Sequence, residues 1–185
     1  MAPILQTKRG FGTVLAALLG LTVAFTGANA QERIGELRAQ VYELLTWQCG
    51  VRDVEDRFRA TIAGIGRDAQ PILVSVLTDG LPADVRQDAE RRAGQRFERR
   101  QSWLEENGEE LFGRDAERIA AVDRAEYVAD TLRRLEVLFR ENAIRGLGEI
   151  GDRDAAGAIR EAAKQNPDLG ALAEAALDSI DERQQ

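Results

Sequence analysis

"GLGEIGD", residues 146–152, contains the pattern G-x-G-x-x-G, with glycines at positions 146, 148 and 151. In dinucleotide-binding enzymes this pattern forms a phosphate loop, with a β-strand before the first glycine and a helix that begins at the last. Here the preceding residues, "RRLEVLFRENAIR" (133–145), are charged, and their apolar members recur with a helical period. Asp168 lies seventeen residues after Gly151, near the expected ribose-binding acid, but "NPDLG" around it is typical of a helix start. The context therefore favours a corner between two helices over a phosphate loop.

A second copy of this corner lies 85 residues earlier in the chain. The paired positions are Val54, Phe58, Ile62, Ile65 and Gly66 in the first copy and Phe139, Ala143, Leu147, Ile150 and Gly151 in the second. Each glycine is followed by a helix that starts with aspartate, "DAQPIL" (68–73) or "DAAGAI" (154–159), and then by a polar turn with a proline. A recurring order of this kind indicates a structural repeat.

The repeat predicts a role for each corner residue. Gly66 and Gly151 are expected to end helices in a left-handed conformation, which glycine adopts without strain. Asp68 and Asp154 are expected to cap the next helices by accepting hydrogen bonds from free backbone N–H groups. Gly148 is expected to let two packed helices approach closely.

The second copy, "ENAIRGLGEIGDRDAAGAIREAAKQNPDLGALAEAAL" (141–177), resembles a HEAT repeat of the short bacterial kind also found in phycobilisome-lyase-type proteins. Residues 139–180 match that pattern well and residues 51–90 more loosely, since Arg67 stands where the pattern has aspartate. The resemblance implies an irregular α-solenoid of about six to eight antiparallel helices, with units at 51–90 and 139–182. It implies protein binding and no catalytic residues. Residues 91–138 do not match and are expected to form an irregular helical stretch.

Helical periodicity elsewhere predicts an all-α protein. A helix that Pro82 opens is expected to run to about Glu106, where "ENGEELFG" (106–113) indicates a break. A long helical pattern follows from Asp115 and is expected to bend or break around residues 123–126, because a single helix of that length would be unusual.

The first thirty residues have the features of a secretory signal peptide. Lys8 and Arg9 precede an uncharged, mostly apolar run at residues 11–25, and Ala28 and Ala30 supply an A-x-A cleavage site. The run is shorter than the roughly 20 residues that span a bilayer as a helix. Cleavage after Ala30 leaves a helical repeat domain at 31–185 with 23 basic and 32 acidic residues, hence a net charge of −9. The sequence thus predicts a periplasmic or secreted protein without a stable membrane span.

The composition argues against several kinds of chemistry. The sequence contains no histidine and a single cysteine, which removes Ser–His and Cys–His pairs and a thiolate metal cage. Cys49 is expected to be a buried thiol, with an intermolecular disulfide as the alternative. "EENGEE" (105–110) lacks the ligand spacing of a calcium loop and is expected to be a solvated acidic turn. No catalytic residue, metal or cofactor is predicted, and the acidic charge argues against nucleic-acid binding.

The most cationic stretch of the chain offers a candidate binding surface. It lies along one edge of a helix whose inner stripe includes Ala93 and Phe97. Its members are Arg92, Arg96, Arg99, Arg100 and Trp103. Two explanations stay open: the arginine stems cover apolar surface while their heads reach water or neighbouring acids, or the strip faces outward as a docking surface.

Two functions follow as hypotheses. The first is an exported, non-catalytic scaffold or adaptor that binds a protein partner along an extended face, as helical repeats usually do. The second is a lyase-type accessory factor that holds a small ligand or a client protein for modification. The second would need a deep groove with clustered polar groups. The sequence leaves the partner and the oligomeric state open.

Overall fold

The computed structural model describes residues 31–185. The predicted signal peptide lies outside the described residues. The chain divides into two compact units, one that ends at Gln40 and one that comprises Val41–Gln185. The described part of the first unit, residues 31–40, is helical and mostly exposed, and this helix ends at residue 45.

The described part of the chain is all-α, as predicted, and contains no strand between residues 31 and 185. Short 3₁₀ segments at Gly66–Ala69, Gly113–Asp115 and Pro167–Leu169 join some of the helices. The helices of the second unit are α2 (Arg52–Ile65), α3 (Gln70–Asp79), α4 (Ala83–Phe112), α5 (Ala116–Ala120), α6 (Arg124–Ile150), α7 (Arg153–Gln165) and α8 (Gly170–Glu182). Of the helices described, none combines the length and apolar composition that a membrane span requires.

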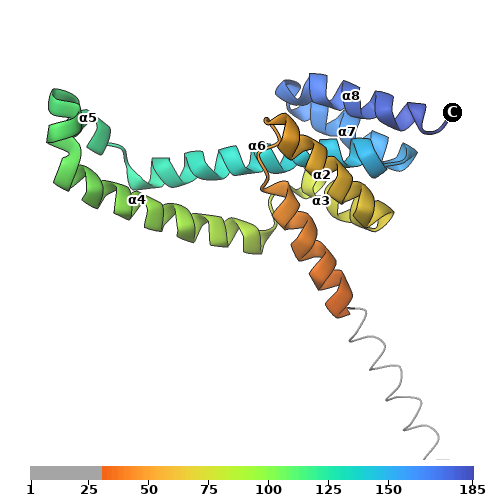
Figure 1. Ribbon diagram of the computed structural model, residues 1–185, viewed down its shortest axis with the longest axis horizontal. Coiled ribbons are helices and arrows are strands. Elements are labelled where there is room, and N and C mark those ends of the chain that lie inside the picture. The colour runs from red at the N-terminus through yellow and green to blue at the C-terminus, as the bar shows by residue number, and fades with distance from the viewer. Residues whose placement is uncertain (1–30) are drawn as a thin grey trace, which may run out of the picture. The chain divides into compact units, whose positions relative to one another are not determined.

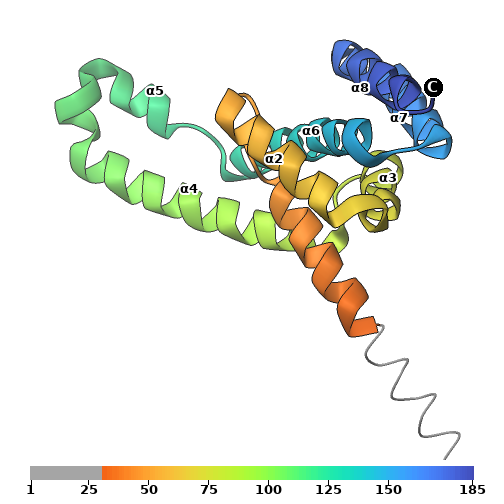
Figure 2. The ribbon, with the colours of Figure 1, turned by 45° about the vertical axis from the view of Figure 1, so that its right-hand side comes forward.

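Helix α6 is the centre of the second unit, because it contacts α2, α3, α4 and α8. Its C-terminal half is surrounded by α2, α3, α7 and α8, whereas its N-terminal half runs beside α4 (Figures 1 and 2). Helix α5 closes this α4–α6 hairpin at its far end (Figures 1 and 2). The equivalent helices of the two matched stretches also touch, α2 with α6 and α3 with α7. The stretch without a repeat match, 91–138, forms most of the hairpin.

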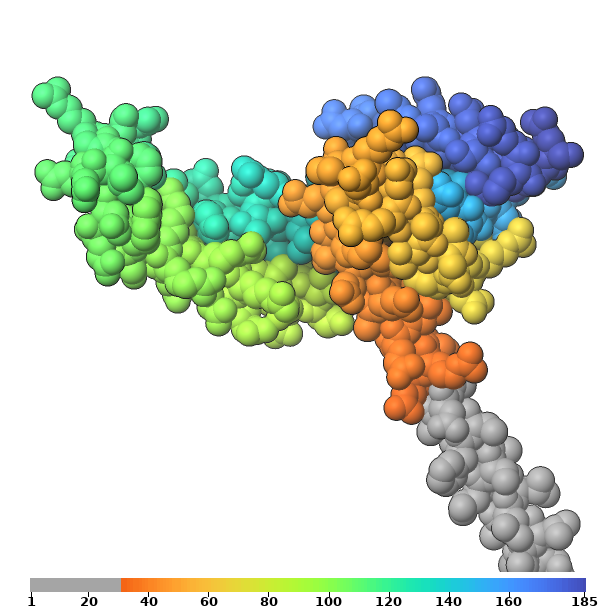
Figure 3. Space-filling model, viewed as in Figure 1, coloured from red at the N-terminus to blue at the C-terminus, as the bar shows by residue number. Residues whose placement is uncertain are grey.

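The core gathers around the C-terminal half of α6. The side chains of Phe139 and Leu147 on α6 are fully buried. Their neighbours from the surrounding helices are buried to the same degree and comprise Phe58 and Ile62 of α2, Leu73 and Leu77 of α3, Ile159 of α7 and Ile180 of α8. Each such side chain stabilises the fold by about 1.5–3 kcal/mol when fully removed from water. The far end of the hairpin lies apart from these helices (Figure 3) and buries few large side chains.

One buried polar residue ties the N-terminal segment of the second unit to this core. Asn142 of α6 is fully buried, and its side-chain amide donates to the backbone carbonyls of Leu45 (3.0 Å) and Trp47 (2.7 Å). These carbonyls lie at the end of a helix, where the next helical turn is absent; the carbonyl of Trp47 also accepts from the N–H of Cys49 at 3.1 Å. The amide therefore replaces the missing helical hydrogen bonds and holds residues 45–47 against α6.

The two corner glycines differ in conformation. Gly66 follows α2 with φ of 74°, a backbone angle that favours glycine. Gly151 follows α6 with φ of −68°, so the predicted left-handed conformation is wrong there. Glycine is needed at 151 for a different reason, because a Cβ atom would lie 2.5 Å from the carbonyl oxygen of Leu147 and 3.0 Å from Cβ of Ala155. Space, and not backbone angle, excludes other side chains at this corner.

Neither Asp68 nor Asp154 is a helix cap, so both predicted caps are wrong. Asp152, and not Asp154, caps α7, since its carboxylate accepts hydrogen bonds from the N–H groups of Asp154 (3.0 Å) and Ala155 (3.3 Å). Asp68 lies within a 3₁₀ segment, and α3 begins at Gln70 without a side-chain cap. The missing cap of α3 follows from a difference between the two copies of the repeat. Arg67 occupies the position equivalent to Asp152 and cannot accept a hydrogen bond, so a 3₁₀ turn leads into α3 instead.

Helix α4 runs further than predicted. It continues through residues 106–112 and ends at Gly113, whose φ is 50°. The predicted break corresponds to a bend near the C-terminal end of α4 (Figures 1 and 2). In this region the side-chain amide of Asn107 donates to the carbonyl of Trp103 at 2.9 Å, a local hydrogen bond that competes with the helical ladder. The four glutamates of residues 105–110 therefore lie exposed on a helix and not in a turn.

The expected interruption before α6 is present. Residues 121–123 are not helical, and Asp123 caps α6 by accepting hydrogen bonds from the N–H groups of Ala125 (2.8 Å) and Glu126 (3.1 Å). This break lets α5 and α6 take different directions, which closes the hairpin.

Candidate binding groove

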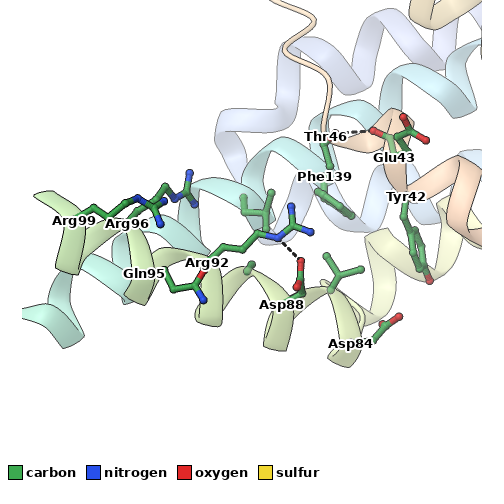
Figure 4. Close-up of a pocket in the computed structure, with 13 residues that line it drawn as sticks. Tyr42, Glu43, Thr46, Asp84, Asp88, Arg92, Gln95, Arg96, Arg99 and Phe139 are labelled. Atoms are coloured by element: carbon green, nitrogen blue, oxygen red, sulfur yellow. Dashed lines mark hydrogen bonds and ion pairs between the residues drawn. The ribbon is translucent and has the colours of Figure 1, made fainter.

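A groove of about 760 Å³ runs along α4. Helix α4 forms one long wall, α6 forms the floor, and residues 42–46 close one end (Figure 4). The lining residues are Asp84, Val85, Asp88, Ala89, Arg92, Gln95, Arg96 and Arg99 of α4, Leu135 and Phe139 of α6, and Tyr42, Glu43 and Thr46.

The helical period of α4 places the groove residues on one face. Arg92, Arg96 and Arg99 follow one another at intervals of four and three residues, so their side chains leave the helix in similar directions. The buried face of α4, which includes Ala93 and Leu104, points elsewhere. Phe97 of α4 contacts Tyr127 of α6, with ring centroids 5.5 Å apart, and this contact holds the two helices together.

Charge is separated along the groove. Arg92 is neutralised within α4, because its Nε lies 2.6 Å from a carboxylate oxygen of Asp88. Arg96 and Arg99 are exposed, and among residues 31–185 neither forms an ion pair or a hydrogen bond. The carboxylates of Asp84 and Glu43 lie at the opposite end of the groove (Figure 4). One end therefore presents two cations with no partner and the other end presents two anions.

The floor of the groove is apolar and aromatic. Phe139 lies beneath the groove with only 1% of its surface exposed, and the ring of Tyr42 lies 6.5 Å from it between centroids. The apolar surface that a ligand can reach comes from the half-buried Leu135, Val85 and Ala89. Leu135, one helical turn before Phe139, continues the apolar floor toward the arginines. A ligand in this groove would thus meet apolar surface beneath it and charged groups along its side.

The cationic strip predicted from the sequence is not one surface. Arg92, Arg96 and Arg99 line the groove, whereas Arg100 turns toward α5 and donates to the carbonyl of Ile119 at 2.9 Å. Its second guanidinium nitrogen is buried without a hydrogen-bond partner. Trp103 is 46% exposed but lies outside the groove lining and contacts Phe112 at 6.2 Å between ring centroids. Three of the five predicted binding residues therefore belong to the groove.

Several groove residues carried no signal in the sequence. Leu135 and Phe139 appear there only as members of a helical apolar pattern, Phe139 also as a repeat position, and Tyr42 belongs to no pattern. Their approach to the arginines depends on how residues 42–46 and α6 pack beside α4, which a local pattern does not contain.

The glycine pattern that resembles a phosphate loop lies mostly inside α6. Gly146 and Gly148 are buried in the last turns of that helix, where N–H groups are hydrogen-bonded along the helix axis. A Cβ atom at Gly146 would lie 2.9 Å from a methyl carbon of Leu73, and one at Gly148 would lie 3.2 Å from Cα of Ala176. The glycines thus serve close helix packing, the role expected of Gly148.

Cys49 is buried, with 2% of its surface exposed and no disulfide. Burial raises the pKa of its thiol above the ordinary value, although the nearby charge of Arg145 acts in the opposite direction. A thiol of this kind is poorly reactive at neutral pH. In the described residues, no cluster of three or more acidic or cysteine side chains has the arrangement of a metal site.

Comparisons of the chain with known protein families, with curated proteins and with solved structures give no match.

Proposed function

We propose that the protein is an exported, non-catalytic scaffold or adaptor that holds a segment of a partner protein in the groove along α4. The observation that carries the proposal is the pair Arg96 and Arg99, two exposed guanidinium groups without a partner in the described chain, beside an apolar floor. Protein interfaces favour this combination of arginine with aromatic and aliphatic surface.

The proposed architecture is an irregular HEAT-like array. Helices α2 and α3 with the start of α4 would form one unit (51–90), and the C-terminal part of α6 with α7 and α8 would form the second (139–182). The contacts of α2 with α6 and of α3 with α7 support this assignment, since equivalent helices of neighbouring repeats pack together in such arrays. The stretch between the two repeat units, 91–138, would be an insertion that supplies part of the groove lining. Export is proposed from the basic, apolar and A-x-A order of residues 1–30.

A charge-reversed variant tests the binding role. Arg96→Glu with Arg99→Glu changes the groove, and Arg52→Glu with Arg160→Glu serves as the matched control. The control arginines are exposed, lie on α2 and α7, and make no ion pair or hydrogen bond within residues 31–185. Both variants change the net charge equally, and both are expected to melt at the temperature of the unmodified protein.

The assay is covalent cross-linking in cells from a photoreactive residue at Gln95, which lines the groove. The unmodified protein and the control are expected to give the same discrete adduct, and the groove variant is expected to lose it. Adducts of equal yield in all three proteins would refute a partner site in this groove.

The lyase-type accessory role is the second candidate, and the size and polarity of the groove favour it. The groove combines 760 Å³ of space with several charged side chains, which is the site that such a role requires. A small ligand retained by the purified protein and released by Arg96→Glu with Arg99→Glu, without any protein adduct, would favour this function over the adaptor.

A further inference from the structure

We infer that the groove receives an amphipathic helix of a partner protein, with carboxylates in its C-terminal turn against Arg96 and Arg99. This inference rests on the proposed function and adds the secondary structure, charge and direction of the bound segment. The length of the groove indicates the helix, the unpaired arginines indicate its acids, and the charge at the other end indicates its direction.

The dimensions of the groove match part of a helix. Its wall extends from Asp84 to Arg99, which is about 22 Å along the axis of α4 at 1.5 Å per residue. The groove is partly open to solvent, and a helix is about 10 Å wide. A helix of about 15 residues that follows this wall would therefore have one face covered and the other face in water. An occupant with one face covered and one face in water must be amphipathic.

Arg96 and Arg99 require acidic side chains on the face of the bound helix that enters the groove. Arg96 and Arg99 are three residues apart, so they are separated by about 4.5 Å along α4. Two carboxylates three or four residues apart on a second helix have nearly the same separation and can meet both guanidinium groups. The half-buried side chains of Leu135, Val85 and Ala89 form the apolar part of the lining and require leucine-like side chains next to those carboxylates.

The charge at the two ends of the groove sets the direction of the bound helix. A helix carries partial positive charge at its N-terminus and partial negative charge at its C-terminus. Asp84 and Glu43 lie at the end of the groove opposite the unpaired arginines (Figure 4). The N-terminal turn of the occupant therefore belongs beside Asp84 and its C-terminal turn beside Arg99, parallel to α4. The same carboxylates disfavour a polyphosphate or nucleic-acid occupant, whose charge is negative along its whole length.

The inference is tested with synthetic peptides and the chain from residue 31 to residue 185. The reference peptide is an amphipathic alanine–leucine helix of about 15 residues with two glutamates in its last turn. A second peptide of identical composition has the glutamates in its first turn. A third has glutamines in their place, and a fourth carries a central proline that interrupts the helix. Binding is measured by fluorescence anisotropy.

The reference peptide is expected to bind at least about tenfold more tightly than each of the other three, which corresponds to about 1.4 kcal/mol. Arg96→Glu with Arg99→Glu should abolish this preference and should instead select a peptide with lysines in the last turn. Arg52→Glu with Arg160→Glu should leave the preference for glutamate unchanged. Equal binding of the first two peptides would overturn the direction, and undiminished binding of the proline peptide would overturn the helix.

Sedimentation velocity shows whether the occupant of the groove is a second copy of this chain or a separate protein. In a dimer, the exposed glutamates of residues 105–110 of one copy would be the acids that meet Arg96 and Arg99 of the other. A dimer that Arg96→Glu with Arg99→Glu dissociates would overturn the inference of a separate partner protein. If no peptide binds but the cross-linked adduct still depends on these arginines, the inferred helix is wrong and the proposed function stands. Loss of both results would refute both.

Discussion

The contact between α6 and α8 supplies a stringent test of the packing described above. At Gly148, a Cβ atom would lie 3.2 Å from both Cα and Cβ of Ala176. One of these neighbours is a backbone atom of a helix, so it cannot move aside as the end of a flexible side chain can. Gly148→Ala must therefore push α8 away from α6 or strain both helices.

The matched control is Gly157→Ala in α7. Gly157 is exposed within a helix, and an added Cβ atom would meet nothing within 4 Å. Both changes replace a helical glycine by alanine, which favours the helix by about 1 kcal/mol. Only Gly148→Ala adds an overpacking cost, which is typically about 1–3 kcal/mol. The free energies of unfolding of the two variants should differ by that cost, whatever the helix propensity contributes.

We expect Gly157→Ala to raise the free energy of unfolding by about 1 kcal/mol and Gly148→Ala to lower it or leave it nearly unchanged. For a chain of this size, a difference of 2 kcal/mol corresponds to about 4–8 °C in melting temperature. Urea and thermal unfolding followed by far-ultraviolet circular dichroism measure both quantities. If Gly148→Ala is as stable as Gly157→Ala, the close approach of α6 and α8 is wrong.

Three further predictions concern a cap, a buried amide and a thiol. Asp152→Ala should destabilise the protein by about 1 kcal/mol in urea unfolding at pH 7, whereas Asp154→Ala should change stability by less than about 0.5 kcal/mol. The hydrogen bond from the N–H of Ala155 is the main cause that lowers the pKa of Asp152 below its ordinary 3.8. The cost of Asp152→Ala should therefore be fully present above pH 3.8. It should vanish as the pH falls through the lowered pKa, because the carboxylate becomes protonated. Asn142→Leu should cost about 1–3 kcal/mol in the same assay, because the carbonyl of Leu45 loses its side-chain donor and that of Trp47 keeps only the N–H of Cys49. Cys49 should resist alkylation by iodoacetamide in the folded protein and react in urea, as mass spectrometry would show; rapid alkylation of the folded protein would contradict its burial.

Local sequence signals determined the class of the fold and the approximate positions of its corners. Helical periodicity requires only the side chains within a few turns, so the all-α class follows without knowledge of any tertiary contact. The same locality accounts for the glycine that ends α2 and for the interruption before α6. It accounts less well for caps, because Asp152 and Asp154 are both acceptable cap residues and the backbone angles at the corner decide between them.

The groove is a product of tertiary structure. Arg99 and Arg100 are adjacent and chemically identical, yet Arg99 lines the groove and Arg100 binds a carbonyl of α5. The difference arises because α5 folds back beside α4 and brings its carbonyl groups to one side of that helix only. Likewise, Tyr42 and Phe139 are 97 residues apart and meet because the helices that carry them pack together. A pattern along one helix shows which side chains share a face, but the packing of the other helices decides whether that face is core, contact or binding surface.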